Sequence, residues 1–379
     1  MRDARRGSSS AAPERFRREL RIRILGAGVA GTAAAALLAA AGHEVELIDE
    51  DFAPPALGTS LALFPPAQRV LARIGVLDAV SAGATAPREG RLVGRGGRVL
   101  ATLPSGDAML VPRPHLLACL RRALPSDVRR RRIRVQDVRP LRRGADVLVG
   151  ADGLHSLTRL SGWGEGARAR GHGMTILRGI TPLAPPEISE TWGGGWLFGI
   201  TPLTGGGTNW FASVPEHRAP DREGDLAHLR EVVGGARAAI DTVLEASAPA
   251  RTTVHGLFTV PPVRPVREDV VLIGDAAHAM APNLGHGANT ALSDAAALAT
   301  ALDSAQRIRP ALARYAARRH LVDQGWRLGS EAMLRAAMAD GSSGGRDTVL
   351  GAAGRVLARC PRGARRVAGR VPSDPRVGP

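Results

Sequence analysis

A glycine motif near the start of the chain has the spacing of a dinucleotide-binding loop. Gly26 and Gly28 follow a short predicted strand at 22–25, and Gly31 lies near the start of a predicted helix of small residues at 30–41. The first glycine permits a tight turn, the second lets a pyrophosphate approach the backbone, and the third lets helix and strand pack closely. Free N–H groups at the helix start stabilise the anion. The motif predicts a dinucleotide site, with an ordinary strand-to-helix turn as the alternative.

An acidic residue at the end of the next apolar run supports this interpretation. Asp49 closes the predicted strand at 45–49. A carboxylate at this place accepts hydrogen bonds from ribose hydroxyls and repels a 2′-phosphate, which favours FAD or NAD over NADP in this site. Glu50 is the alternative residue for the same contact.

A second glycine-rich segment lies far downstream of the first. Gly274 and Asp275 follow the apolar run at 270–273, and a stretch suited to a turn extends from Pro282 to Asn289. An aspartate at a strand end can hold a ribityl hydroxyl, with a plain helix N-cap as the alternative. The helix start behind the turn would stabilise negative charge on a reduced flavin. Two such distant loops are expected to lie along one long cofactor, and FAD fits that description.

Two histidines in the late segment raise the question of a metal site. His278 and His286 lack the accompanying carboxylates and cysteines that a metal centre needs. We therefore expect no bound metal.

Taken together, these segments resemble the single-component flavoprotein monooxygenases of the para-hydroxybenzoate hydroxylase class, particularly the salicylate-hydroxylase-like and epoxidase-like branch. The resemblance follows the family's order over residues 22–320. The segments that carry it are 26–49, 58–66 with 71–77, 111–117, 145–156 with Arg159, 196–202 with 209–211, and 271–294.

The resemblance implies an extended FAD, with Asp49 at the adenosine ribose and Asp275 at the ribityl chain. Arg113 would reach the ribityl or pyrophosphate region, and Asp152 with Gly153 would serve both FAD and transient NADH or NADPH. The full set of implied cofactor contacts is Gly26, Gly28, Gly31, Asp49, Arg113, Asp152, Gly153, Gly274, Asp275, Leu284, Gly285, Ala288 and Asn289. The backbone of Pro282, Gly285 and Gly287 would form the catalytic wall near flavin C4a.

The activity implied by the resemblance is an oxidoreductase reaction. NAD(P)H reduces the flavin, oxygen adds to give a C4a-hydroperoxide, and its distal oxygen passes to an aromatic ring or alkene. The chain is thus expected to hydroxylate or epoxidise an aromatic, polycyclic or isoprenoid small molecule. A dehydrogenase or reductase on the same fold is one alternative. A decayed, non-catalytic homologue is another, suggested by the short arginine-rich segment at 128–144.

The elements that must position these residues indicate an α/β fold. We expect an FAD-binding Rossmann-like domain of the glutathione-reductase type, in three layers, with an inserted, mainly antiparallel sheet and a C-terminal helix. The expected division is a disordered extension at 1–20, a discontinuous FAD-binding domain at 21–165 and 262–338, a substrate domain at 166–261 and a basic tail at 339–379.

The middle block supplies candidate substrate contacts, because glycine, threonine and tryptophan replace the helical pattern there. The candidates are Arg178, Trp196, Asn209 and Trp210, with Trp192 and His255 as further pocket residues. Packing within the sheet is the alternative for each of them.

Composition limits the partners of the chain. It has 379 residues and a formal net charge of +16, and its 51 basic residues are all arginine. Arginine beside abundant alanine, glycine and proline is typical of a GC-rich coding bias, so no nucleic-acid partner is expected. No apolar run reaches the length of about 18 residues that spans a membrane. We expect a cytoplasmic monomer or homodimer that acts on a small aromatic or natural-product substrate with molecular oxygen.

Overall fold

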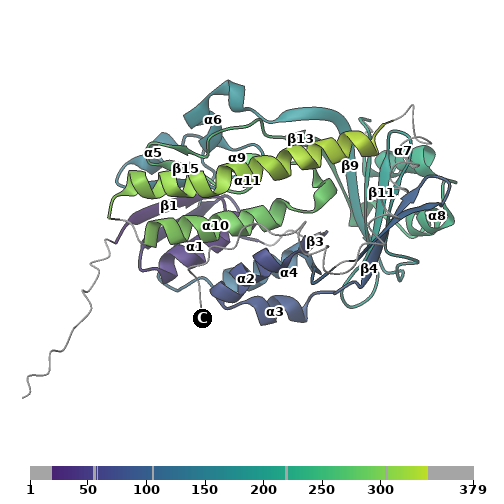
Figure 1. The fold of residues 1–379 in the computed structure, drawn as a ribbon, viewed down its shortest axis with the longest axis horizontal. Helices are drawn as coiled ribbons and strands as arrows, with labels where there is room; N and C mark the ends of the chain where they lie inside the picture. Colours follow the sequence, from purple (N-terminus) through teal and green to yellow (C-terminus); the bar gives the residue numbers. More distant parts are fainter. Residues whose placement is uncertain are drawn as a thin grey trace, which may run out of the picture.

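The computed structural model describes residues 19–53, 57, 59–104, 106–217, 221–303 and 306–339 (Figure 1). The predicted extension at 1–20 lies almost wholly outside these ranges. Gly58 and nearly all of the predicted basic tail lie outside them as well.

Six strands form the first sheet in the order β14-β15-β8-β1-β2-β7. Five of them run parallel, and β14 pairs antiparallel with β15. The bounds are β1 Arg21–Leu25, β2 Glu44–Asp49, β7 Arg129–Arg132, β8 Val147–Gly150, β14 Val266–Arg267 and β15 Val270–Leu272. The central strands are buried on both faces, which is the condition of a parallel sheet enclosed by helices.

Helices cover both faces of this sheet and make the three layers that the sequence predicts. On one face, α1 consists mainly of alanine, and this lets α10 pack closely against it. The helices of this layer are α1 Val29–Ala40, α2 Pro65–Ile74, α3 Leu77–Ala82, α4 Arg113–Arg122 and α10 Gly287–Asp303. The other face is covered by α5 Arg139–Arg142 and α6 Leu157–Trp163.

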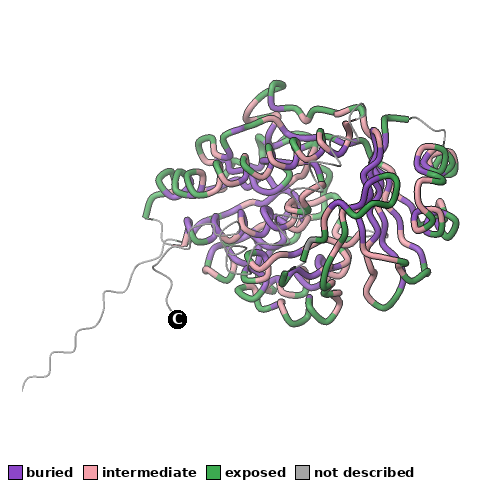
Figure 2. Tube along the Cα trace, turned by 45° about the vertical axis from the view of Figure 1, so that its right-hand side comes forward, coloured by how far each residue is buried: buried purple, intermediate pink, exposed green. Residues whose placement is uncertain are grey.

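Seven strands form the second sheet in the order β13-β9-β12-β11-β10-β4-β5. Helices α7 Arg222–Val233 and α8 Ala238–Glu245 cover one of its faces, on the right of Figure 1. Figure 2 shows buried segments in both parts of the molecule. The strands are β4 Glu89–Gly94, β5 Val99–Pro104, β9 Arg170–Thr181, β10 Ser189–Trp192, β11 Leu197–Pro202, β12 Thr208–Pro215 and β13 Thr252–Thr259.

The second sheet takes a hairpin from outside the range predicted for it. Strands β4 and β5 lie within 21–165, yet β4 pairs with β10 and β5 forms the sheet edge. Residues 89–104 therefore belong to the second sheet and not to the sheet of the predicted FAD-binding domain. With this change, the division of the chain into two domains stays a prediction.

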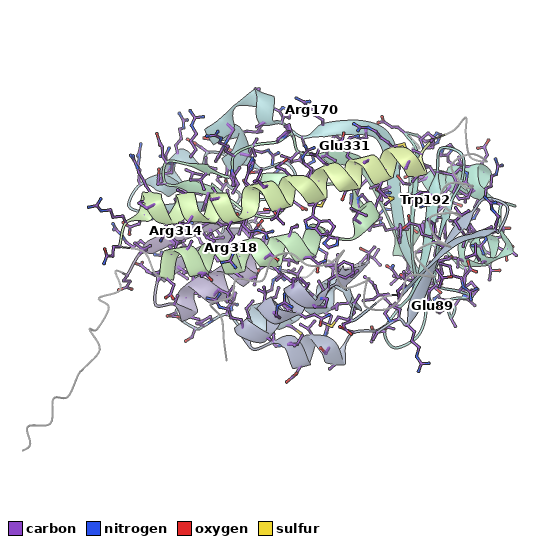
Figure 3. All side chains as sticks on the ribbon, viewed as in Figure 1. Glu89, Arg170, Trp192, Arg314, Arg318 and Glu331 are labelled. Carbon is purple, nitrogen blue, oxygen red and sulfur yellow. The ribbon has the colours of Figure 1, made fainter. Side chains whose placement is uncertain are left out.

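One long helix connects the two parts. Helix α11, Ile308–Ala337, packs on α10 and β14 at its start and reaches the second sheet at its end, where Ala337 contacts Trp192 and Leu197 (Figures 1 and 3). Figure 3 labels Trp192 beside this end of the helix. No helix in the described ranges combines the length and apolarity needed to cross a bilayer.

The arginine-rich segment forms an edge strand of the first sheet. Strand β7 pairs in parallel with β2, and Glu46 on β2 lies 3.5 Å from Arg131 and 2.9 Å from Arg23. An acidic residue between these guanidinium groups allows consecutive arginines at a sheet edge, where the outer side chains remain in water.

Short elements complete the chain. They are β3 Ser60–Leu63 and β6 Met109–Pro112, which pair antiparallel, together with α9 Asp275–His278, η1 Glu165–Ala167, η2 Pro249–Arg251 and η3 Pro282–Leu284.

Candidate active site

Three loops from distant parts of the sequence meet at one edge of the first sheet. Strands β1, β8 and β15 are neighbours and run in the same direction, so the loops that follow them share the carboxyl edge. A Cβ placed on Gly26 would lie 2.2 Å from the Ala151 carbonyl oxygen. A Cβ placed on Gly274 would lie 2.8 Å from the Ala30 Cβ. The early and late glycine loops therefore lie side by side, as the single-cofactor interpretation requires.

The three glycines of the first loop have different surroundings. Gly26 has a φ of +107°, which favours glycine, and a Cβ on Gly31 would lie 1.8 Å from the Gly26 carbonyl oxygen. Gly28 caps α1, lines the cleft, and would place a Cβ in open space with no atom within 4 Å. Gly26 and Gly31 are thus required for packing, whereas Gly28 leaves room for a ligand at the helix start.

The carboxylate of Asp49 connects the end of β2 to the glycine loop. It accepts hydrogen bonds from the backbone N–H groups of Ala27 at 2.5 Å and Asp51 at 2.9 Å. Arg121 donates a hydrogen bond of 3.4 Å to the Ala27 carbonyl oxygen. Burial lowers the pKa of Arg121, and the nearby negative charge of Asp49 acts in the opposite direction. This carboxylate holds the loop and lies beside the sheet edge where the ribose is expected.

Asp152 does not line the cleft with its side chain. Its carboxyl accepts bonds from Ser156 Oγ at 2.6 Å and the Thr158 backbone N–H at 2.9 Å, and burial raises its pKa. It therefore supports the start of α6, while the backbone of Gly153 lines the cleft. The side chain of Asp152 thus has a supporting position, and a direct contact of this residue with the cofactor stays a prediction.

Arg159 hydrogen-bonds both the loop after β8 and the segment after β15. Its buried guanidinium donates to the carbonyl oxygens of Leu154 at 2.6 Å, Ala167 at 2.8 Å and Ala276 at 2.9 Å. The loop after β8 is thereby held against the loop after β15.

A group of charges lies along the cleft. Asp275, Arg113 and Arg178 all line it. Burial lowers the pKa of Arg178, the nearby Arg113 lowers it further, and Asp275 opposes both effects. Arg113 stands at the first turn of α4, directly after β6. This part of the cleft is net positive and suits an anionic ligand.

The turn before α10 closes the cleft. Pro282, Gly285, Gly287 and Ala288 line it, and Gly285 has a left-handed φ of +63°. Asn289 lies behind the turn and braces it. Its side chain accepts a bond from the Phe64 N–H at 2.8 Å and donates to the Ala62 and Gly285 carbonyl oxygens at 2.8 and 3.0 Å.

Two other residues of this turn also face away from the cleft. Leu284 packs toward α11, where its Cδ1 lies 3.5 Å from the Cβ position of Gly329. His286 is stacked between Phe64 and Trp326, with ring-centroid distances of 4.7 and 3.5 Å. Burial lowers the pKa of His286 to about 4, so its imidazole is neutral at physiological pH. The side chains of Leu284 and Asn289 therefore shape the turn, and a direct contact of either residue with the cofactor stays a prediction.

The opposite wall of the cleft is one face of the second sheet. Successive strand residues point to opposite faces, so Asn209, Phe211 and Ser213 share the cleft side of β12. Arg178 pairs with Phe211 in the register and faces the same way. Asn209 donates to Thr201 Oγ1 at 2.7 Å. Arg178 and Asn209 thus line the cleft as expected for substrate contacts.

Trp196 and Trp210 lie elsewhere. Trp210 is fully buried and stacks on Phe198 at 5.7 Å, and Trp196 belongs to the same cluster under α7 and α8. The predicted substrate roles of both residues are corrected, because they face the helices and not the cleft. Trp192 packs near α11, and His255 lies exposed on β13 outside the cleft lining.

A buried charge network supports the late loop from behind. Asp294 accepts bonds from the Gly274 N–H at 2.9 Å, His278 Nε2 at 2.6 Å and Arg319 Nε at 2.7 Å. Burial lowers the pKa of His278, but the charge and hydrogen bond of Asp294 together with the charges of Asp323 and Asp275 outweigh this and raise the pKa to about 9. The expectation that His278 lacks accompanying carboxylates is wrong, because Asp294 and Asp323 lie close enough to it to hold a metal, yet Arg319 already hydrogen-bonds both carboxylates.

Comparison with known proteins identifies the family. Residues 127–327, more than half of the chain, match the family model described as FAD binding domain. The chain is 30% identical over 333 residues to aurachin C monooxygenase/isomerase of Stigmatella aurantiaca, covering 79% of this chain and 84% of the relative.

The chain belongs to this FAD-binding family.

Further relatives agree with this assignment. The 3-amino-4-hydroxybenzoate 2-monooxygenase of Streptomyces cremeus is 30% identical over 320 residues, covering 76% of this chain and 79% of the relative. The crystal structure of Klebsiella pneumoniae HpxO with FAD and uric acid has the same fold, with a TM-score of 0.76 at 22% identity over 92% of this chain and 95% of that one. The family member described here is an FAD-dependent monooxygenase, as its sequence predicted.

The residues of the cleft suit FAD. Its volume of about 440 Å³ is that of a ligand site. The backbone at Gly28 is open to a phosphate. The amide nitrogen and oxygen of Asn283 and the hydroxyl of Ser213 are buried at the cleft and have no protein partner in the described ranges. Buried polar atoms are nearly always satisfied, so these groups are suited to a bound ligand with donors and acceptors.

The sequence analysis missed four residues that line the cleft, namely Phe211, Ser213, Asn283 and Glu190. The alternation of side chains along a strand predicts the first two, because they lie two and four residues after Asn209. Asn283 lies within the predicted turn, where its polar side chain was the available signal.

Proposed function

We propose that the cleft holds FAD in an extended form along the three loops and that an aromatic substrate binds against the second sheet and is hydroxylated there. The observation that carries this proposal is the construction of the cleft. Glycine-rich backbone and the start of α1 form one wall, and a sheet face with mixed polar and aromatic side chains forms the other.

On the loop side, we assign contacts by what each residue offers. The N–H groups at Gly28 and the start of α1 would hold the pyrophosphate, and Asp49 would meet the adenosine ribose. Asp275 would meet the ribityl hydroxyls, and Arg113 would neutralise nearby phosphate charge. The turn from Pro282 to Gly287 would flank the flavin ring.

When bound, the flavin supplies redox chemistry with NADH or NADPH and molecular oxygen. The residues of this chain position the substrate and exclude water. Leu197, Phe211 and Ile176 give the sheet wall an apolar surface, which keeps water out of the reacting region. Arg178 offers a cation with a lowered pKa, suited to an acidic substituent of the substrate. Asn209, held by Thr201, offers its amide oxygen to the backbone N–H of Ser60 and so fixes the adjacent loop.

Two of the relatives support an aromatic substrate, since 3-amino-4-hydroxybenzoate and 2-heptyl-3-hydroxy-4(1H)-quinolone appear in their names. An alkene substrate is the second candidate, since a zeaxanthin epoxidase matches over 42% of this chain.

The test begins with FAD content. Purified protein is expected to carry or take up one FAD per chain. NADH or NADPH consumption should then rise when a hydroxybenzoate, quinolone or polyene is added, and an oxygenated product should appear by mass spectrometry. Protein that binds FAD but transfers hydride without consuming oxygen would support a dehydrogenase. Protein that takes up no FAD would contradict the cofactor site.

A further inference from the structure

Glu190 is a half-buried acidic residue that faces the cleft and has no counter-charge among the described residues. It lies on β10, where Glu190 and Trp192 point to the cleft side and Ser189 and Thr191 point toward the helices. The Glu190 side chain keeps some accessible surface, and it belongs to the lining of the cleft.

A single protein donor reaches this carboxyl within the described part of the chain. Trp192 Nε1 donates to Glu190 Oε1 at 2.6 Å, and the second oxygen is left to the cleft. Burial raises the pKa of Glu190, and the Trp192 bond opposes this only in part. A buried carboxyl without a cation is costly, and such groups concentrate at functional sites.

Arg178, the cation on the same wall of the cleft, is too far from Glu190 to form an ion pair with it. The register aligns Glu190, Gly199, Phe211 and Arg178 in one row across four strands. Three strand steps of roughly 4.8 Å separate the two charged residues by about 14 Å at the backbone. No arginine contributes to the pKa shift of Glu190.

Phe211 occupies the space between them. A Cβ on Gly199 would lie 2.1 Å from Phe211 Cζ, so the ring lies across Gly199 in the direction of Glu190. The wall thus offers an aromatic surface with a free carboxyl oxygen at its end. A flat ring on Phe211 would bring a ring substituent toward Glu190.

We propose that Glu190 is a specificity-determining residue that selects aromatic substrates carrying a nitrogen donor, either an amino group or a protonated ring nitrogen. An arylamine offers two N–H donors to the carboxyl group, and a protonated ring nitrogen also brings the positive charge that the protein does not provide. A phenol donates a hydrogen bond but brings no cation, and a methyl group brings neither. The inference rests on the proposed function, since it requires the aromatic substrate to lie against the second sheet.

The test measures binding in the FAD-loaded enzyme without NADH or NADPH, so that turnover plays no part. The probes are 4-hydroxybenzoates with a 3-amino, 3-hydroxy or 3-methyl group. Dissociation constants come from isothermal titration calorimetry and from the change in the flavin absorbance spectrum. We expect the amino member to bind roughly tenfold or more tightly than its methyl counterpart, the scale of a hydrogen bond to a charged group.

Glu190→Gln keeps the shape and the acceptor for Trp192 but removes the charge. It is expected to reduce the amino-over-methyl preference to about threefold or less while FAD content stays at the wild-type level. Glu89→Gln on neighbouring β4 is the matched control, because Glu89 is exposed and its loss should leave the preference unchanged.

The outcomes separate the inference from the proposed function. An amino preference that persists in Glu190→Gln overturns the inference, as does a wild-type enzyme that prefers the hydroxy or methyl members. In either case, arene-stimulated NAD(P)H consumption would leave the proposed function intact. If no aromatic probe binds the FAD-loaded enzyme, both the inference and the aromatic substrate class are overturned.

Discussion

Two glycines of the first loop should respond in opposite ways to alanine, and this separates cofactor binding from folding. At Gly28 a Cβ meets no atom within 4 Å, and φ is −73°, which any residue adopts. Gly28→Ala is therefore expected to change the unfolding free energy of the apoprotein by less than about 1 kcal/mol, since cap loss and reduced chain entropy oppose each other.

The same methyl group points into the open space where a phosphate would approach. Loss of one hydrogen bond from the backbone to a charged phosphate costs roughly 1.5–3 kcal/mol, which corresponds to a weakening of FAD binding by about 10- to 150-fold.

Gly31→Ala should behave differently. Its Cβ would lie 1.8 Å from the Gly26 carbonyl oxygen, a backbone atom that cannot rotate away. Helix α1 and the loop would have to move apart by about 1 Å or more, an overpacking that costs on the order of 1–3 kcal/mol. This variant should lose stability even as the apoprotein.

The assay is a FAD titration of each apoprotein followed by fluorescence, with thermal unfolding measured on the same samples before FAD is added. If Gly28→Ala binds FAD as tightly as wild type, the loop does not hold the pyrophosphate. If Gly31→Ala is as stable as wild type, the close packing of helix and loop is not real.

Three further outcomes follow from the contacts. Asn289→Ala removes three hydrogen bonds behind the turn and should destabilise the protein by about 2–4 kcal/mol in chemical denaturation, since buried partners are left unpaired. Trp210→Phe should lower the unfolding free energy without changing ligand affinity, because Trp210 packs in the core under α7 and α8. Phe211→Leu should weaken the binding of aromatic ligands at nearly unchanged stability, because Phe211 lines the cleft. Equal effects of the two variants on binding would contradict the assignment of strand faces. The pKa of His278, raised to about 9, stabilises the folded state below pH 6.5, and this contribution of roughly 3 kcal/mol is lost as pH rises toward 9. His278→Gln should flatten the unfolding free energy over that pH window, and an unchanged slope would contradict a protonated His278.

The loops of the first sheet could be predicted from the sequence because their function depends on local backbone geometry. Gly26 and Gly31 are glycine for reasons visible in the motif, namely a positive φ and a close contact. Once β1, β8 and β15 are recognised as parallel strands, their following loops must share one edge. The meeting of Gly26 and Gly274 follows from that topology.

The sheet face was predicted less well, for a reason that lies in strand geometry. Asn209 and Trp210 are adjacent on one strand and cannot both face the cleft. Size and aromaticity favoured Trp210, but its burial under α7 and α8 uses that size for packing. Sequence alone does not tell which face of a strand meets helices when both faces are buried, because the alternation of apolar and polar residues is then weak.

Residues within the motifs also divide into two kinds that the sequence does not distinguish. Asn289 and Asp152 each stand in a recognisable motif, yet both use their side chains to hold backbone in place. Gly287, two residues before Asn289, and Gly153, which follows Asp152, present that backbone to the cleft. A motif therefore predicts where the ligand lies more reliably than it predicts which atom touches it.

The two walls of the cleft have different functions, cofactor binding on the loop wall and substrate binding on the sheet wall, and they differ in how well they tolerate substitutions. The loop wall relies on backbone groups and on glycines that tolerate no added atom, as at Gly26 and Gly31. The sheet wall relies on side chains whose neighbours point alternately away from the cleft, so a substitution at Glu190 or Phe211 need not disturb the core under α7 and α8. Substrate choice can thus change on the sheet without loss of the cofactor. For that reason a cleft-facing carboxyl such as Glu190, which lies outside every motif that identifies the family, is a more informative guide to the substrate than the motifs themselves.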